Sequence, residues 1–203
     1  MNEINDTELM RVRLRFIDLV KSFFAEEPDA EKMSRWRGTF SSLCNEQVSP
    51  RFDSAVQEIS RALNGKKLED IQSEYYQLFT DPFDGSQIES NASFYFNGRS
   101  YGEALVEMRG LMDDAGIVKI KEVSEPEDSL VVMLDTFASL IEEEKTDSGA
   151  KVKELQARLL EEFLEPFAEK FTAQLKDNKH CDFYYLCCRV LGGYLDLEKS
   201  LVA

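Results

Sequence analysis

Residues that interrupt helices are scarce in this sequence, with 10 glycines and 5 prolines among 203 residues. Long periodic segments lie between them, which favours an all-α fold. No apolar stretch approaches the length of a membrane span. The first residues, Met1-Asn2-Glu3-Ile4-Asn5-Asp6, are acidic and lead into no uncharged apolar run, unlike a signal peptide. We therefore expect a cytoplasmic protein whose residues 1–203 form a single-domain bundle of about eight helices.

Side chains that bind metals or act as nucleophiles are also few. His180 is the single histidine, and the four cysteines contain no CxxC pair. A metal site needs more ligands at closer spacing, and a nucleophile needs a positioned base. The sequence contains no Walker loop, HExxH pattern or nucleophile elbow. We expect no catalytic residue, no metal site, no cofactor, and buried cysteines in a reducing compartment.

Basic residues are fewer than acidic ones: the sequence has 24 Lys and Arg against 39 Asp and Glu, and its formal net charge is −15. Phosphate contacts need clustered Lys and Arg, so this balance argues against nucleic acid as the main partner. It is compatible with a basic partner, and equally with a charge that only maintains solubility.

Several helices are marked by local signals. Apolar residues recur at helical spacing from about Asp6 to Ala25, from Leu68 to Thr80 and from Ser100 to Ala115. Ser49-Pro50 is typical of an N-cap followed by proline at the first helical position, and Gly116 of a C-cap. A long helix begins near Lys151, and Pro166 must kink or divide it.

The helical pattern disappears from Asp81 to Arg99, which predicts one long loop. Phe83, Ile88 and the Phe94-Tyr95-Phe96 run give it too much apolar mass for a solvated connection. Long loops in compact domains are unusual and often functional. This loop either packs as a lid on the helices or lines a groove, and Phe94 to Phe96 could also form a short strand.

The segment Ser124 to Leu130, which we call the central motif, opens the most regular helix pattern. Ser124 and Glu127 have the spacing of a capping box, and Pro126 falls in the predicted first turn. One apolar stripe follows, formed by Leu130, Met133, Leu134, Phe137, Leu140 and Ile141. On this helix Asp128 projects away from the stripe, together with Val132, Asp135 and Ser139.

Two interpretations of these acidic residues remain open. Acids beside an outward Val132 could bind a partner that is both cationic and apolar. They could also only complement the positive end of the helix dipole, since acidic first turns are ordinary.

Several segments together resemble the TorD/DmsD/NarJ family of cytoplasmic chaperones for exported or membrane-attached redox enzymes. Glu125-Pro126-Glu127-Asp128 resembles the E-P-x-D-H element of that family, and Tyr75 to Phe79 resembles its Y-x-x-L-F helix end. Glu89-Ser90 resembles part of its Pro-aromatic-x-Ser loop, and Phe183-Tyr184-Tyr185 the start of its last helix. Two positions depart from the pattern: Ser129 replaces the family's His, and Gln87-Ile88-Glu89-Ser90 replaces a Pro-rich loop that contains Trp.

The resemblance implies an all-α chaperone that binds the twin-arginine signal peptide of a molybdenum-containing oxidoreductase subunit and delays export until its cofactor is inserted. Carboxylates of Glu125, Asp128 and Glu89 would pair with the two guanidinium groups. Tyr76, Phe94 and Tyr95 would receive the apolar part of the peptide. The complete set of expected site residues is Tyr76, Phe79, Glu89, Ser90, Phe94, Tyr95, Glu125, Pro126, Asp128 and Ser129.

Other functions compete with this one. Within the family, the chain could be a NarJ-type assembly chaperone for a membrane-attached nitrate reductase. Outside it, the chain could be a helical adaptor or a protein that binds a small molecule. The expected partner is a redox-enzyme catalytic subunit, and both a monomer and a swapped homodimer stay possible.

Overall fold

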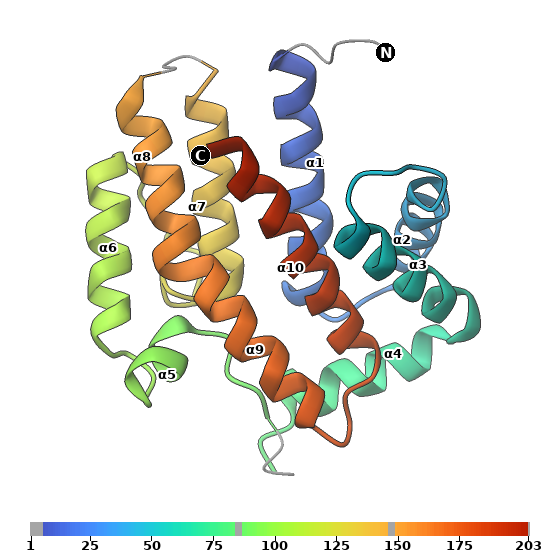
Figure 1. The fold of residues 1–203 in the computed structure, drawn as a ribbon. Helices are drawn as coiled ribbons and strands as arrows, with labels where there is room; N and C mark the ends of the chain where they lie inside the picture. Colours follow the sequence, from blue (N-terminus) through green and yellow to red (C-terminus); the bar gives the residue numbers. More distant parts are fainter. Residues whose placement is uncertain (1–5, 84–86, 146–148, 203) are drawn as a thin grey trace. The chain divides into compact units, whose positions relative to one another are not determined.

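The computed structural model describes residues 6–83, 87–145 and 149–202 (Figure 1). Over these residues the elements are α-helices and two π-helical segments with no strand, so the all-α prediction is confirmed. The expectations for residues 1–5, for residues 84–86 of the predicted loop and for a polar turn at 146–148 concern residues outside this description. None of the described helices is long and apolar enough to cross a membrane.

The chain divides into two compact units. Unit 1 comprises Met1–Lys21, Ser90–Phe167 and Leu197–Ala203, and unit 2 comprises Ser22–Glu89 and Ala168–Asp196. Three helices contribute residues to both units: α1 (Asp6–Phe24), α9 (Glu165–Asp177) and α10 (Phe183–Val202). The single domain expected from the sequence stays a prediction.

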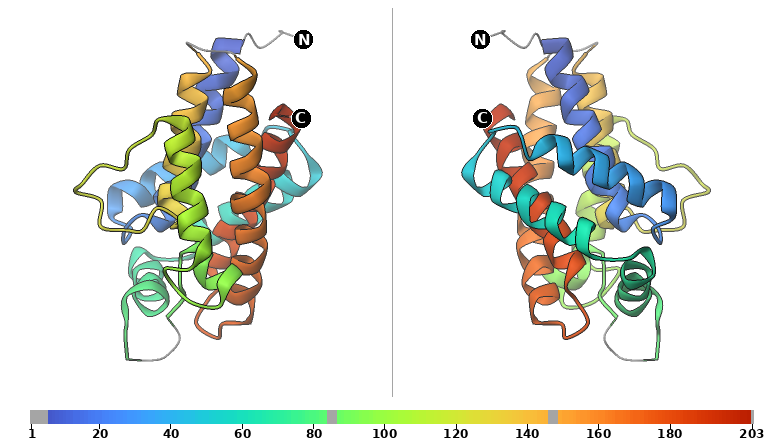
Figure 2. Two further views of the ribbon diagram at one scale, coloured as in Figure 1. Left: turned by 90° about the vertical axis from the view of Figure 1, so that its left-hand side faces the viewer. Right: turned by 90° about the vertical axis from the view of Figure 1, so that its right-hand side faces the viewer.

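Unit 1 is built around α7 (Leu130–Glu143), which packs against α8 (Ala150–Arg158) and the π-helical segment η2 (Leu159–Leu164). Helix α6 (Glu103–Ala115) packs against both α8 and the short α5 (Ala92–Asn97), as Figure 1 shows. The predicted stripe of α7 is buried throughout, because Leu130, Met133, Leu134, Phe137, Leu140 and Ile141 are each at most 2% exposed. In both views of Figure 2, the connection between α6 and α7 extends away from these helices.

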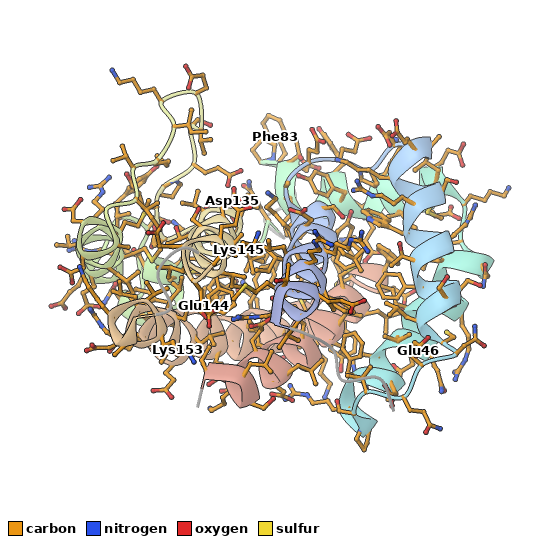
Figure 3. The ribbon with its side chains drawn as sticks, turned by 90° about the horizontal axis from the view of Figure 1, so that it is seen from above. Glu46, Phe83, Asp135, Glu144, Lys145 and Lys153 are labelled. Carbon is orange, nitrogen blue, oxygen red and sulfur yellow. The ribbon has the colours of Figure 1, made fainter. Side chains whose placement is uncertain are left out.

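A buried ionic cluster lies inside unit 1. The Arg13 guanidinium donates to Glu198 Oε2 at 2.8 Å, to Glu144 Oε2 at 3.0 Å and to Gln156 Oε1 at 2.8 Å. Glu144, labelled in Figure 3, follows the last residue of α7. Burial opposes the charge of Arg13, but its bonds to the two glutamates outweigh burial and raise its pKa. The cluster therefore joins α1, α7, α8 and the end of α10 through charge-assisted hydrogen bonds.

Unit 2 contains α2 (Ala30–Leu43) and α3 (Pro50–Gly65), which pack against each other. It also contains α4 (Leu68–Tyr75), which is followed by the π-helical segment η1 (Tyr76–Thr80). Ser49 caps α3 and Pro50 is its first residue, as predicted. The core is rich in aromatic side chains, and the Trp36 ring packs against Phe23 at 5.0 Å and Phe183 at 6.0 Å between ring centroids. Gly193 allows a close approach, because an added Cβ would lie 3.1 Å from Phe52 Cα.

The predicted loop from Asp81 to Arg99 is only partly a loop. Residues Ala92 to Asn97 form α5, so the expectations of a non-helical segment or a strand are wrong there. Ile88 is buried at 5% exposure, whereas Phe83 is 92% exposed and its ring stands away from the ribbon in Figure 3. The loop thus packs through some apolar residues and presents another to solvent.

Candidate functional site

The central motif is not the first turn of a helix. Helix α7 begins at Leu130, and its N-cap is Ser129, whose Oγ accepts a hydrogen bond from Val132 N at 3.3 Å. The prediction that Ser124 caps this helix is wrong, because Ser124 is exposed in the preceding connection. Pro126 lies in a turn in which its carbonyl accepts from Ser129 N at 3.0 Å. Both serines have an N-cap pattern, but Ser129 directly precedes the apolar stripe, which is the part that must be buried.

Asp128 occupies a different environment from the one predicted. It is 0% exposed rather than projecting from an outer face, and Val132, expected to point outward, is 4% exposed. The Asp128 Oδ2 atom accepts hydrogen bonds from Ser93 N at 2.7 Å and from Ser93 Oγ. Because the helix begins after Asp128, helical geometry does not apply to this side chain. It is free to turn inward to the partner that Ser93 provides.

Backbone pairing brings the motif to the predicted loop. Leu130 N donates to Ser90 O at 2.8 Å, and Ala92 N donates to Asp128 O at 2.8 Å. Between these bonds Asn91 and Ser129 form an isolated antiparallel bridge. The structure therefore brings Ser90 together with Asp128 and Ser129, although the sequence separates them by more than 30 residues.

The two glutamates of the motif differ in their partners. Glu127 accepts from Arg109 Nη2 at 2.9 Å, and Lys119 Nζ lies 3.9 Å from its other oxygen. Partial burial raises the pKa of Glu127, but the bond from Arg109 outweighs burial, so the net effect lowers it. Glu125 Oε2 accepts from Ser129 Oγ at 3.1 Å, and among the described residues its carboxylate pairs with no Lys or Arg. Glu125 is therefore the half-buried acid of the motif that can accept an external cation.

Aromatic side chains follow the bridge directly. Phe94 and Tyr95 lie on α5, are half-buried, and contact each other edge to face with 5.3 Å between ring centroids. Tyr95 also packs edge to face on Phe167 at 5.2 Å. Because α5 begins at the bridge, these rings are tied to the segment that contacts Ser129.

Tyr76, Phe79 and Glu89 belong to unit 2 and form a second group. Tyr76 is 48% exposed, whereas the Phe79 ring packs against Tyr75 at 5.1 Å and Tyr184 at 5.2 Å. Both residues lie in η1, and π-helical turns frequently occur at functional sites. Glu89 is exposed at the end of this unit.

Sequence reasoning missed Asn91 and Ser93. Both are buried, at 6% and 0% exposure, and both contact the motif segment. Within the described ranges, Asn91 Oδ1 and Asp128 Oδ1 are buried without a hydrogen-bond partner. Buried acceptors of this kind are rare and call for an explanation. The signal for α5 was present, because Asn precedes its first residue at an N-cap position, but no pattern identified Asp128 as the partner of Ser93.

Cys187 and Cys188 are buried as expected, but Cys44 is exposed and Cys181 is half-buried, so the expectation of buried cysteines is wrong for Cys44. Three of the four thiols do not favour thiolate chemistry. Burial raises the pKa of Cys181 to about 12 and, together with neighbouring groups, raises the pKa values of Cys187 and Cys188 well above the ordinary value. A thiol reacts as its thiolate, so these three are unreactive at neutral pH. In the part of the chain that the structure describes, no group of three or more His, Cys, Asp or Glu side chains is placed to hold a metal ion.

A surface groove of about 580 Å³ lies in unit 1 on α6 and on the segment formed by α8 and η2. Its lining is mainly charged and consists of Glu107, Gly110, Asp114, Arg158 and Glu162. None of the residues predicted from the sequence contributes to it. The groove is therefore separate from the site built by the central motif.

Comparisons with known proteins place these features in context. The model of the family described as nitrate reductase delta subunit matches residues 45–173, which is more than half of the chain. The crystal structure of a candidate redox enzyme maturation protein from Archaeoglobus fulgidus has 19% sequence identity and a TM-score of 0.54, and the alignment covers 91% of this chain and 94% of that one. At this identity the likeness concerns the fold alone. A search of curated proteins found no significant match.

Proposed function

Because the chain belongs to the nitrate reductase delta subunit family of NarJ- and TorD-like chaperones, we propose that it binds the twin-arginine signal peptide of a molybdenum-containing oxidoreductase subunit. The family is one of redox enzyme maturation chaperones, not of catalytic enzymes. In the proposed role, the protein acts in the cytoplasm and holds the apoenzyme back from export until its cofactor is inserted. This requires only differential affinity for the immature and mature client.

The observation that carries the proposal is the state of Glu125. Its neighbour Glu127 is already engaged by Arg109 and Lys119, whereas Glu125 has only the Ser129 hydroxyl on its carboxylate among the described residues. A guanidinium group presents a planar fork of donors that matches a carboxylate. Lys119 Nζ also donates to the backbone carbonyl of Glu125, but not to its carboxylate. This half-buried carboxylate, which pairs with no cation among the described residues, is thus suited to one of the two arginines of such a peptide.

The apolar part of the peptide needs a surface as well. Phe94 and Tyr95 are half-buried on α5, which begins at the bridge to Ser129. Amphipathic segments bind where apolar side chains are presented on a fixed element beside polar anchors. Ser90 and Pro126 shape the backbone around this surface rather than offering charge. We assign the charged contact to Glu125 and the apolar contact to α5.

Tyr76, Phe79 and Glu89 remain part of the proposal as a contact on unit 2. Tyr76 and Glu89 are exposed, and Phe79 supports the π-helical segment from within the aromatic core. Because these residues belong to the other unit, their contribution is tested separately, by Tyr76→Ala. This variant removes an exposed ring without disturbing the core.

Calorimetric titration with a synthetic twin-arginine peptide tests the proposal. Glu125→Gln removes the charge with little change of shape and should weaken binding by about 1–3 kcal/mol, the range for a hydrogen bond to a charged group. Glu122→Gln, an exposed acid on the same connection, is the matched control and should bind like wild type. Equal affinities for wild type and Glu125→Gln would remove Glu125 from the site, and no binding by wild type would refute the proposal.

A second candidate is favoured by the family match itself. The matched model is described as nitrate reductase delta subunit, so a NarJ-type role in assembling a membrane-attached nitrate reductase is the alternative. Mass spectrometry of the proteins that co-purify with the chain separates the two roles. A catalytic subunit carrying a twin-arginine leader supports the first, and a nitrate reductase catalytic subunit without one supports the second.

A further inference from the structure

We infer that Asp128 is a positioning residue that holds α5, and with it the aromatic surface, rather than a carboxylate that pairs with the arginines of the client. This inference rests on the proposed function and assigns a role within the same site. It reverses the role that the sequence alone suggests for Asp128.

Asp128 caps α5 from another part of the chain. The N-cap residue of α5, Asn91, makes no side-chain capping bond. Instead, Asp128 O accepts from Ala92 N and Asp128 Oδ2 accepts from Ser93 N, 35 residues away in sequence. Helix N-termini have unsatisfied N–H groups that a carboxylate stabilises. A helix of 6 residues is unstable alone, so α5 depends on such contacts.

Burial separates the Asp128 carboxylate from an external ligand. Asp128 and Ser93 are both 0% exposed, and Asp128 Oδ1 is buried without a hydrogen-bond partner in the described chain. A guanidinium group reaches this carboxylate only if the packing around it opens, and Ser93, which binds it, follows a segment that backbone bonds attach to residues 128–130. Glu125 offers a carboxylate without that cost.

Asp128 is linked to peptide recognition through α5. Its hydrogen bonds act on the first turn of α5, and the same short helix carries Phe94 and Tyr95. The Tyr95 ring is oriented edge to face on Phe167, so a shift of α5 moves both aromatic rings. Asp128 should therefore control binding of the apolar part of the peptide, while Glu125 controls binding of its arginines.

Three peptides distinguish these roles: the complete twin-arginine peptide, one with both arginines replaced by glutamine, and one with its apolar residues replaced by serine. Fluorescence anisotropy gives the affinity of each for wild type, Asp128→Asn, Ser93→Ala and Glu125→Gln at two salt concentrations. Asp128→Asn should weaken the complete and arginine-free peptides equally, by about tenfold, because the Asn amide oxygen accepts from Ser93 without the charge that strengthens these bonds. It should leave the serine-substituted peptide and the salt dependence unchanged. Glu125→Gln should show the opposite selectivity.

Amide exchange on the same variants provides a readout without peptide. Residues 92–97 should exchange faster in Asp128→Asn and Ser93→Ala, and combining the two changes should add little, while α7 stays protected. Ser93→Ala is the milder change, so it keeps the test valid if Asp128→Asn folds poorly. If the effect of Asp128→Asn disappears with the arginine-free peptide, or if exchange of α5 is unchanged, Asp128 does not act through α5 and the inference is overturned. Failure of wild type to bind the complete peptide instead refutes the proposed function.

Discussion

Unit 1 contains two buried carboxylate sites that differ in the groups bonded to the carboxylate. At the first, Glu198 is 1% exposed and shares the Arg13 guanidinium with Glu144, and Gln156 completes the cluster. At the second, Asp128 is 0% exposed, and within the described ranges its carboxylate accepts hydrogen bonds only from the amide and hydroxyl of Ser93. The Glu198 carboxylate pairs with a cation, whereas the Asp128 carboxylate accepts from the neutral donors of Ser93.

The difference indicates different roles. A paired buried charge is tolerated because its partner offsets the cost of leaving water, and the Arg13 cluster joins four helices as part of the scaffold. A buried carboxylate that has only neutral donors and one unpartnered oxygen is a costly arrangement. It persists where a particular local geometry is required. Here that geometry is the attachment of α5 to the start of α7.

Breaking the first site should have the largest effect. Arg13→Met keeps the apolar stem but leaves Glu198 buried without a cation, so the free energy of unfolding should fall by about 3–5 kcal/mol. Urea denaturation measures this loss. Arg15→Met, at an exposed position of the same helix, is the control and should change stability little. Similar values for the two variants would show that the cluster does not stabilise the fold.

A smaller effect is expected at the cap between the second site and α7. Ser129→Ala removes the side chain that accepts from Val132 N and should cost about 0.5–2 kcal/mol, the usual range for an N-cap. Ser124→Ala should have no measurable effect, since Ser124 is exposed and caps nothing in the described structure. Thermal unfolding of both variants checks the assignment. A larger loss for Ser124→Ala would favour the helix start suggested by sequence.

The smallest effect concerns Glu127, a partly buried acid of the same motif. The Arg109 bond lowers the pKa of Glu127 in the folded protein, despite the opposing effect of burial. The pair therefore stabilises the fold above the unfolded glutamate pKa of about 4.3, and this contribution is lost as pH falls through the lower folded pKa. Its size should be at most about 1 kcal/mol, because Arg109 is largely exposed.

The measurement for Glu127 is the pH dependence of urea unfolding. Between about pH 5 and pH 3, wild type should lose slightly more stability than Glu127→Gln, since only wild type has this carboxylate to protonate. Identical slopes for the two proteins would show that the ion pair with Arg109 contributes nothing in solution.

Much of the fold could be predicted because its signals are local. Ser49 and Pro50 start α3, and Gly116 ends α6 with a φ of 68°, as their residue types indicate. The misplaced start of α7 and the missed α5 have one cause. Both depend on the pairing of Asn91 with Ser129 across a large separation in sequence, and no periodicity within either segment reports that contact.

The candidate site was predicted in its composition more than in its geometry. The acids and aromatic residues of the motif were found by residue type, but helical periodicity placed Asp128 on an outer face when it is buried. Its partner Ser93 lies in a stretch with no distinctive pattern, and only the folded chain brings the two together. Which of several acids is accessible is a property of tertiary packing, so sequence could not assign Glu125 and Asp128 their separate roles.

The π-helical segment η2 affects the direction in which the buried side chains of the surrounding helix point. Buried residues recur there at intervals of four: Leu155 and Gln156, Leu159 and Leu160, Phe163 and Leu164, then Phe167. In an α-helix of 3.6 residues per turn, each such step would rotate the buried face by about 40°. The i→i+5 bond from Glu165 N to Leu160 O widens the turn and takes up the excess. Pro166, which lacks an N–H, follows where the α-helical bonding is already interrupted. In this chain, a four-residue apolar period before a proline thus coincides with a π-helical turn.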